Sequence, residues 1–536
     1  MHIMTKWQKY FPYKQPRDLQ VSAINEILDS FKTNRFFALE AGTGVGKSAV
    51  GLTVAKSILE NPAEEGYEKG AIFVTTQKLL QDQYEKDFGN LSMKSIKSSS
   101  NYTCNFKKTK SCNEGQSELQ SIEKGTRQWN TCTFNCNYKK AKQDFLDSPL
   151  SVTNFPYLMT EANYNGKIKP RQLLIIDEAH NVETELSKFI EVAVSERFAK
   201  SSLKISFPSL KTHHQAFVWI RDIYFPKLKR HCDHIKKMLE KYHGLKGKID
   251  QFTKLSRQLR ATDSHQKKIE QFLEVHEKDN WVFENTFSDH KGYKKITFKP
   301  IDVSKFAEQY LFRLGHKVLF MSATILCSDK FFESLGIASR SSSLSLPSPF
   351  PVKNRPILHV PMGKMTAKEI DKTLPILCKA IEKILEQHKT EKGIIHTHSY
   401  KIANYLKSHI KSKRLLFSDA SNRDEILKKH MSAKTPTVLV SPSMTEGVDL
   451  HGDHSRFQVI CKVPYPYLGD KLVKKRMNKW KWWYSFQTAK CLIQSIGRSI
   501  RSKEDRAVTY ILDSDWDRFY CYNGSLFPTD FSNCIK

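Results

Sequence analysis

Short apolar runs that end in polar loops recur along the chain and predict a series of buried strands. In the N-terminal half these runs are residues 36–40, 71–75 and 173–176. In the C-terminal half they are residues 393–396, 437–440 and 457–461, and helical stretches lie between them. Strands that alternate with helices are typical of parallel sheets, so the pattern predicts an α/β fold.

The chain is too long, at 536 residues, for a single hydrophobic core. A proline-rich segment, SLPSPFPVKNRP at residues 345–356, predicts a linker, with a second α/β unit that begins near Pro347. We therefore expect two α/β units.

Two gaps between motifs of the first unit are much longer than the roughly 30 residues of a strand–helix–strand unit, so each predicts an insertion. The first lies between residues 75 and 173, and the second between Asp177 and Ser322. Helical spacing in the second gap predicts an antiparallel helical hairpin, through Leu228, Cys232, Ile235, Leu239 and Tyr242, and then Phe252, Leu255 and Leu259. The predicted division is residues 1–90, 141–188 and 296–345 for the first unit, 91–140 and 189–295 for the insertions, and 346–536 for the second unit.

A glycine-rich loop, AGTGVGKS, follows the first predicted strand and precedes a helical pattern that begins at Ala49. Glycines in such a loop let backbone amides approach phosphate oxygens, and the helix N-terminus adds partial positive charge. Lys47 would reach the β- and γ-phosphates, and the Ser48 hydroxyl would ligate magnesium. The usual motif begins with glycine, where this chain has alanine. The predicted nucleotide ligands are Gly42, Thr43, Gly44, Val45, Gly46, Lys47 and Ser48.

The segment LLIIDEAH places two carboxylates directly after a predicted buried strand. Acidic side chains at the carboxyl end of a parallel strand face the crevice where ligands bind. Asp177 is predicted to hold the magnesium ion, and Glu178 to orient and deprotonate the attacking water.

A third segment, QSIGRSIR at residues 494–501, carries Gln494, Arg498 and Arg501 at spacings that share one face of a helix. Two guanidinium groups in this arrangement can stabilise charge on a transferring phosphoryl group. A salt-bridged surface helix is the alternative for this segment taken alone.

The charge balance narrows the choice of partners. Lys and Arg total 86 against 56 acidic residues, a formal net charge of +30 spread along the chain. Such an excess favours a polyanion, and nucleic acid or an anionic membrane surface would fit. Because no apolar stretch approaches about 20 residues, membrane insertion is not expected. Eleven cysteines without a secretion signal suggest reduced thiols in a cytoplasmic protein.

These three motifs, in this order, resemble superfamily 2 helicases, and within that group the chain is similar to the iron–sulfur helicases typified by XPD and DinG. Further matching segments are RDLQ (17–20), VTTQKLLQDQ (74–83), MSATI (321–325), KGIIHTHSY (392–400) and TEGVDLHGD (445–453). The resemblance implies two RecA-like motor domains, with a cysteine-rich iron–sulfur insertion and a helical arch-like insertion in the first.

The resemblance also implies roles by motif position. Gln20 would recognise adenine, with Arg17 beside it at the nucleotide. His180, Ser322 and Thr324 would couple hydrolysis to movement. Contacts to nucleotide or strand would come from Glu446, Gly447 and Asp449, and Gln494 would join Arg498 and Arg501 at the nucleotide.

Four of the cysteines fall within the first gap, at Cys104, Cys112, Cys132 and Cys136. Clustered thiolates suit a soft metal or an iron–sulfur cluster. The spacing itself leaves zinc and iron open, although the paired CxxC arrangement of many zinc sites is missing. The resemblance favours a [4Fe-4S] cluster, with Zn²⁺ as the alternative.

The resemblance therefore implies an ATP- and Mg²⁺-dependent helicase that moves 5′ to 3′ along single-stranded DNA and unwinds forked duplexes, in a bacterial or phage-infected cell. A nucleic-acid-stimulated ATPase that clamps or remodels complexes without unwinding is the alternative. A binding protein with a dead ATP site is disfavoured because Lys47, Asp177, Glu178, Arg498 and Arg501 are all present. The motifs indicate no protein partner, and repair, replication and phage propagation all stay open as pathways.

Overall fold

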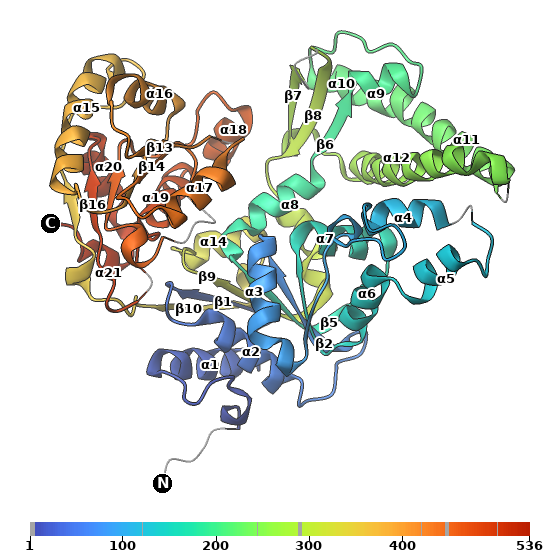
Figure 1. The fold of residues 1–536 in the computed structure, drawn as a ribbon, viewed down its shortest axis with the longest axis horizontal. Coiled ribbons are helices and arrows are strands. Elements are labelled where there is room, and N and C mark those ends of the chain that lie inside the picture. Colours follow the sequence, from blue (N-terminus) through green and yellow to red (C-terminus); the bar gives the residue numbers. More distant parts are fainter. Residues whose placement is uncertain are drawn as a thin grey trace.

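Two parallel sheets organise the chain, and they stand side by side in Figure 1. The computed structural model describes residues 6–119, 122–243, 245–287, 292–419, 421–444, 450–500 and 502–536. Within these residues the first sheet has seven strands, in the order β10-β1-β9-β5-β2-β4-β3, and the second has six, in the order β11-β16-β15-β12-β14-β13. Every strand pairing in both sheets is parallel, which confirms the predicted α/β class.

The first sheet is buried on both faces. Its strands are β1 (Phe36–Ala41), β2 (Glu68–Thr75), β3 (Met93–Ser95), β4 (Leu150–Asn154), β5 (Arg171–Asp177), β9 (Gly315–Ser322) and β10 (Ser341–Leu346). Phe37 and Leu39 of β1 point to one face and Phe36 and Ala38 to the other, and all four side chains are buried. One face is covered by α1 (Asp18–Ser30), α2 (Lys47–Ile58) and α3 (Lys78–Phe88), and the other by α7 (Phe155–Thr160), α8 (Val182–Ile190), α13 (Ser304–Tyr310) and α14 (Ser328–Leu335).

The strand order of this sheet determines where its motifs meet. Strands β1, β9 and β5 are neighbours, and they run parallel. Their carboxyl ends therefore lie at the same edge of the sheet. The glycine-rich loop, the MSATI segment and the DEAH segment follow these three ends, so the fold brings them together although they are far apart in sequence.

The second sheet forms the second α/β unit. Its strands are β11 (Ile357–His359), β12 (Gly393–His396), β13 (Leu415–Phe417), β14 (Val438–Ser441), β15 (Phe457–Ile460) and β16 (Val508–Ile511). Helices α15 (Ile370–Gln387) and α16 (Tyr400–His409) cover one face, and α19 (Trp483–Ile496) and α20 (Asp515–Asn523) cover the other. The strands predicted at 393–396, 437–440 and 457–461 match β12, β14 and β15 to within one residue.

The first insertion is a small helical segment between β3 and β4. Three short helices, α4 (Cys112–Leu119), α5 (Arg127–Phe134) and α6 (Asn137–Asp147), carry or flank its cysteines. We call residues 99–147 the cysteine segment. Its α6 packs against β3 and β4, which anchors the segment to the edge of the first sheet.

The second insertion combines the predicted hairpin with a sheet that was not predicted. Helices α11 (Phe225–Tyr242) and α12 (Ile249–Val275) pack against each other as the helical spacing indicated. At their base, β6 (Val192–Ser195), β8 (Lys294–Pro300) and β7 (Trp281–Phe287) form an antiparallel sheet. Strand β8 also crosses residue 295, where the predicted insertion ended. We call residues 192–300 the helical insertion (Figure 1).

Candidate active site

The glycine-rich loop follows β1, and its backbone requires glycine at two positions. Gly44 and Gly46 have φ values of 83° and 88°, a left-handed conformation that other residues rarely adopt. Helix α2 begins at Lys47, two residues before the predicted start, so its free amides lie directly at the loop. Lys47 Nζ donates a hydrogen bond of 3.0 Å to the carbonyl of Ala41. A phosphate at the loop would offer this ammonium a charged partner in place of the carbonyl.

Side chains from α1 close around this loop. Gln20 Nε2 donates to the carbonyl of Val45 at 2.9 Å, and Gln20 Oε1 accepts from the backbone N–H of Arg17, also at 2.9 Å. The Arg17 guanidinium donates to the carbonyl of Gly44. Gln20, predicted to recognise adenine, and Arg17, predicted to lie at the nucleotide, therefore lie against the phosphate loop itself.

Phe350, from the linker between the two units, also packs on the loop. A Cβ atom placed on Gly44 would lie 2.4 Å from Cζ of the Phe350 ring, so no side chain can be added there while the ring stays in place. Phe350 is buried and clusters with Ile500 and Ala507 of the second unit. No sequence motif marks this residue, because it is an apolar side chain in a proline-rich linker.

Asp177 ends β5 and lies at the base of the site. Its side chain is buried, and burial, followed by repulsion from Glu178, raises the pKa of its carboxyl group. A bound cation would oppose both effects and favour the ionised carboxylate. Glu178 has a φ of 52°, a strained left-handed conformation, and its Oε2 lies 3.4 Å from Nδ1 of His180.

Tyr84 links the two residues predicted to hold magnesium. Its hydroxyl donates a hydrogen bond of 2.9 Å to Asp177 Oδ2 and also interacts with the Ser48 side chain. Burial, and then the charge of Asp177, raises the pKa of Tyr84 far above its usual value, so the hydroxyl stays protonated. Tyr84 lies on α3, outside every motif, and only the folded sheet brings it to the site.

A chain of hydrogen bonds connects the DEAH segment to the second unit. His180 Nδ1 lies 2.7 Å from Ser322 Oγ, which accepts a 3.0 Å hydrogen bond from the backbone N–H of Thr324. The hydroxyl of Thr324 in turn accepts a 3.2 Å hydrogen bond from Gln494 Nε2 on α19. His180, Ser322 and Thr324 were predicted to couple hydrolysis to movement. They are thus connected by hydrogen bonds to Gln494, which was predicted to lie at the nucleotide.

The arginines of this segment need one correction. Helix α19 ends at Ile496, with Gly497 as its C-cap, so Arg498 lies on the turn after the helix rather than on the predicted helical face. Arg498 Nε still donates a 2.9 Å hydrogen bond to the carbonyl of Gln494. The predicted residues Arg501, Glu446, Gly447 and Asp449 lie outside the residues that the structure describes.

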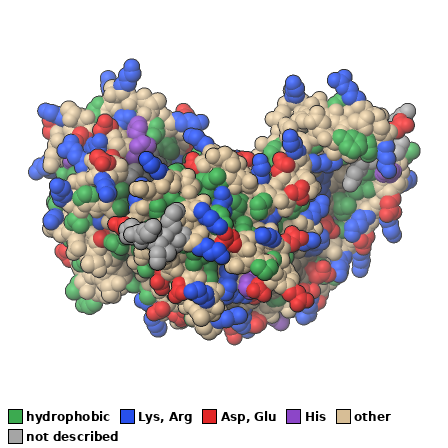
Figure 2. Space-filling model, turned by 90° about the horizontal axis from the view of Figure 1, so that it is seen from below, with side chains coloured by type: hydrophobic (Ala, Val, Ile, Leu, Met, Phe, Trp, Pro, Cys, Tyr) green, Lys and Arg blue, Asp and Glu red, His purple; other side chains and the backbone are tan. Residues whose placement is uncertain are grey.

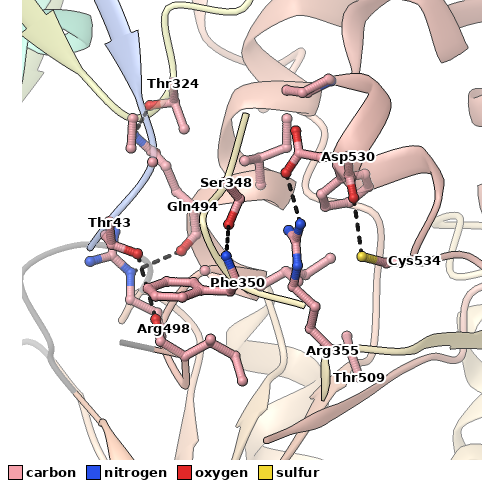
Figure 3. Close-up of a pocket in the computed structure, with 18 of the residues that line it drawn as sticks. Thr43, Thr324, Ser348, Phe350, Arg355, Gln494, Arg498, Thr509, Asp530 and Cys534 are labelled. Carbon is pink, nitrogen blue, oxygen red and sulfur yellow. Dashed lines mark hydrogen bonds and ion pairs between the residues drawn. The ribbon is translucent and has the colours of Figure 1, made fainter. Parts of the chain in front are cut away.

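A cleft between the two units is lined by some of these groups, including Glu178, His180 and Thr324, whereas Lys47 and Asp177 lie outside its lining. Figure 3 shows Thr43, Phe350, Gln494 and Arg498 around it. The contacts that cross it near the phosphate loop are long, such as the 3.5 Å from Thr43 Oγ1 to the carbonyl of Ile500. The cleft can therefore close further around a ligand.

The four predicted metal-ligating cysteines line one small cavity in the cysteine segment. They are Cys104, Cys112, Cys132 and Cys136, and all are buried. Cys112 Sγ and Cys136 Sγ lie 3.3 Å apart, and burial raises the pKa of the Cys112 and Cys132 thiols. Within the described residues, no group of three or more His, Cys, Asp or Glu side chains has an arrangement that could hold a metal ion. The thiols thus fit an iron–sulfur cluster in number and donor type, but their arrangement is not that of a metal site.

Comparisons with known proteins agree with this geometry. Residues 381–522 match the sequence family described as the helicase C-terminal domain, and residues 13–207 match the type III restriction enzyme res subunit. The ATP-dependent DNA helicase DinG of Photobacterium profundum is 27% identical over 256 residues, which are 44% of this chain and 36% of that relative. YoaA, an ATP-dependent DNA helicase of Escherichia coli, is 21% identical over an alignment of 610 positions. The alignment covers 94% of this chain and 92% of that relative. These matches support the resemblance to the XPD/DinG-like helicases of superfamily 2.

Solved structures show that the chain has the fold of this group. A structure titled XPD helicase has a TM-score of 0.65 at 16% identity and covers 96% of this chain and 98% of its own. Xpd4 of S. tokodaii has a TM-score of 0.60 at 15% identity, covering 97% of this chain and 99% of its own. The two α/β units are therefore RecA-like domains, and residues of the three motifs line the cleft between them.

Proposed function

We propose that this helicase moves 5′ to 3′ along single-stranded DNA and separates duplex DNA, driven by ATP hydrolysed between its RecA-like domains. The observation that carries the proposal is the hydrogen-bonded chain from His180 through Ser322 and Thr324 to Gln494. It links the loop that would sense the γ-phosphate to the domain that would move. The polarity rests on the resemblance to XPD and DinG.

Each catalytic residue has a role in this proposal. Lys47 and the amides of α2 bind the β- and γ-phosphates, and Ser48 and Asp177 hold the magnesium ion that neutralises them. Glu178 orients the attacking water and accepts its proton as the bond to the γ-phosphoryl group forms and ADP leaves. Arg498 and Arg501 bring positive charge from the second domain to the transferring phosphoryl group.

Hydrolysis then changes how the domains are held together. While ATP is bound, its γ-phosphate attracts groups from both domains and favours a closed cleft. Loss of phosphate removes that attraction. The remaining hydrogen bonds across the cleft are few and do little to hold it closed, so the cleft reopens. Alternate closing and opening of the two domains on a strand produces directional movement when each domain changes its grip in turn.

We further propose that the cysteine segment holds a [4Fe-4S] cluster on Cys104, Cys112, Cys132 and Cys136, with Zn²⁺ as the alternative. The support is that four buried thiols line one cavity in a segment that is otherwise polar. A cluster would cross-link α4, α5 and the loop before α6, and so give this small segment a rigid core that its few apolar residues do not supply.

The surface charge supports a nucleic-acid partner. Figure 2 shows Lys and Arg side chains spread over both ends of the molecule and beside the hollow between them, interspersed with acidic side chains. Formal net charge is +30, and such a surface attracts polyanions at long range. In the described part of the chain, no helix is both long and apolar enough to cross a membrane. We place the helicase in the cytoplasm of a bacterial or phage-infected cell.

ATP hydrolysis with and without single-stranded DNA tests the motor assignment. Lys47→Ala is expected to lower turnover by about a thousandfold because phosphate binding and charge neutralisation are lost together. Glu178→Gln is expected to bind ATP and to hydrolyse it about a thousandfold more slowly. The matched control is Lys56→Ala, which removes a charge elsewhere on α2. Turnover retained in Lys47→Ala would remove that residue from its role.

A further inference from the structure

Helix α18 (Lys471–Lys479) of the second domain makes a buried contact with the first domain. Its Arg476 is only 6% exposed, and Nη1 lies 2.7 Å from Glu183 Oε1. Nε donates a 2.9 Å hydrogen bond to the carbonyl of Ile301, and Nη2 a 3.3 Å bond to that of Pro300. All three guanidinium nitrogens are therefore engaged by the first domain. We call this contact the Arg476 socket.

The partners of Arg476 belong to two functional parts of the first domain. Glu183 lies on α8, the helix that directly follows the DEAH segment. Pro300 and Ile301 lie where β8, the last strand of the helical insertion, returns to the motor core. On the same side, Lys479 forms an ion pair with Asp302, and α18 packs against β7. One helix of the second domain thus holds both the DEAH helix and the base of the insertion.

The socket differs from the rest of the domain interface in the nature of its contacts. Near the nucleotide cleft, the domains touch through hydrogen bonds of 3.2 Å from Gln494, 3.3 Å from Lys490 and 3.5 Å from Thr43. The socket is instead charged and buried, and two of its three contacts are 2.7 Å and 2.9 Å long. Opening the socket would break the ion pair to Glu183 and both hydrogen bonds of the Arg476 guanidinium group at once, and charged hydrogen bonds of this kind are stronger than neutral ones. Movement is therefore easier at the ATP cleft than at the socket.

We propose that α18 is the joint through which closure of the second domain reaches the helical insertion, and that Arg476 is its positioning residue. When the cleft closes on nucleotide, α18 keeps hold of α8 and β8 and shifts the base of the insertion with it. The motor can still step along a strand without this joint, but the insertion no longer moves in time with it. Duplex separation therefore depends on Arg476 more than hydrolysis does. The inference rests on the proposed helicase function.

Three activities of the full-length protein separate this role from a general structural one. They are DNA-stimulated ATP hydrolysis, movement along single strands measured by displacement of streptavidin from a biotinylated end, and unwinding of a tailed duplex. Arg476→Ala is expected to retain hydrolysis and single-strand movement within about twofold, and to unwind about tenfold more slowly. Arg476→Lys keeps the charge opposite Glu183 and is expected to recover part of the unwinding rate. The control, Lys475→Ala, removes an exposed charge from the same helix and should match the wild type.

Equal losses in all three activities would show that the socket serves the motor itself, and no loss would show that it is not needed; either result overturns the proposal. Hydrogen exchange provides a readout that does not depend on unwinding. A non-hydrolysable ATP analogue should change exchange in residues 294–302 of the wild type and Lys475→Ala, and leave Arg476→Ala unchanged. The same change in Arg476→Ala would contradict the joint. A wild type that neither unwinds DNA nor moves along it, yet shows the exchange pattern, would contradict the proposed function and leave the joint intact.

Discussion

Gln494 in the second domain donates a 3.2 Å hydrogen bond to the hydroxyl of Thr324 in the first, across the mouth of the nucleotide cleft. Thr324 is bonded through Ser322 to His180, next to the carboxylates that would act on ATP. The state of the γ-phosphate and the position of the second domain are therefore connected through a few side chains. Such a connection is what the proposed motor requires in addition to hydrolysis.

Thr324→Val tests that connection, because it removes one hydroxyl with almost no change in shape. Gln494 Nε2 then loses its partner, at a cost of about 1 kcal/mol or about fivefold in rate. We expect DNA-stimulated turnover to fall by that factor while the affinity for ATP stays close to the wild type. Thr488→Val is the control, since that hydroxyl bonds only a carbonyl of its own helix among the contacts described. An equal fall in both variants would argue against a coupling role.

Gly44→Ala is expected to weaken ATP binding for two separable reasons. The left-handed φ of 83° costs about 1–3 kcal/mol for a residue with a side chain. In addition, the new Cβ would meet the Phe350 ring at 2.4 Å. Adding Phe350→Ala should remove the clash and leave the backbone strain, so the double variant should bind a fluorescent ATP analogue with intermediate affinity. Wild-type affinity in Gly44→Ala would mean that the loop rearranges when nucleotide binds.

The cysteine assignment predicts a coloured protein. Anaerobically purified wild type should carry iron and the broad visible absorption of an iron–sulfur cluster, and Cys112→Ser should lose both because a thiolate ligand is removed. Cys378→Ser changes a buried cysteine of the second domain and should keep both. A colourless, active wild type that contains zinc would replace the cluster with Zn²⁺ and leave the ATP site as described.

The helical insertion should lose stability in mild acid. His265 lies 2.8 Å from the hydroxyl of Tyr224, and burial, with the charge of Lys268, lowers the pKa of His265 to about 4. The unfolded chain binds a proton near pH 6.5, so stability is complete above that pH and falls on the order of 3 kcal/mol as pH drops to about 4. His265→Gln cannot take the proton, and proteolysis of the insertion should then depend less on pH. An unchanged pH profile would contradict this.

Much of the site was predictable because its motifs are local, and the parts that were not depend on the fold. Local sequence patterns marked several parts of the site and the fold. A glycine-rich loop marked Lys47, an apolar strand followed by carboxylates marked Asp177, and helical spacing of apolar residues marked the hairpin of α11 and α12. Tyr84 and Phe350 reach the site only through the packing of α3 and the linker, so no spacing marks them. The sheet at the base of the insertion was missed because β6 is four residues long and β8 begins with two lysines and ends in a proline, which leaves only a short apolar pattern between them. The end of α19 was misplaced because the spacing continues through Gly497 although the helix does not.

Unwinding of matched duplexes with either a 5′ or a 3′ single-stranded tail tests the central claim most directly. With ATP and Mg²⁺ present, the wild type is expected to separate the 5′-tailed duplex in preference to the 3′-tailed one, and Lys47→Ala should separate neither. Preference for the 3′ tail would contradict the polarity. ATP hydrolysis stimulated by DNA without separation of either duplex would contradict the helicase function and favour an ATPase that clamps or remodels its complexes.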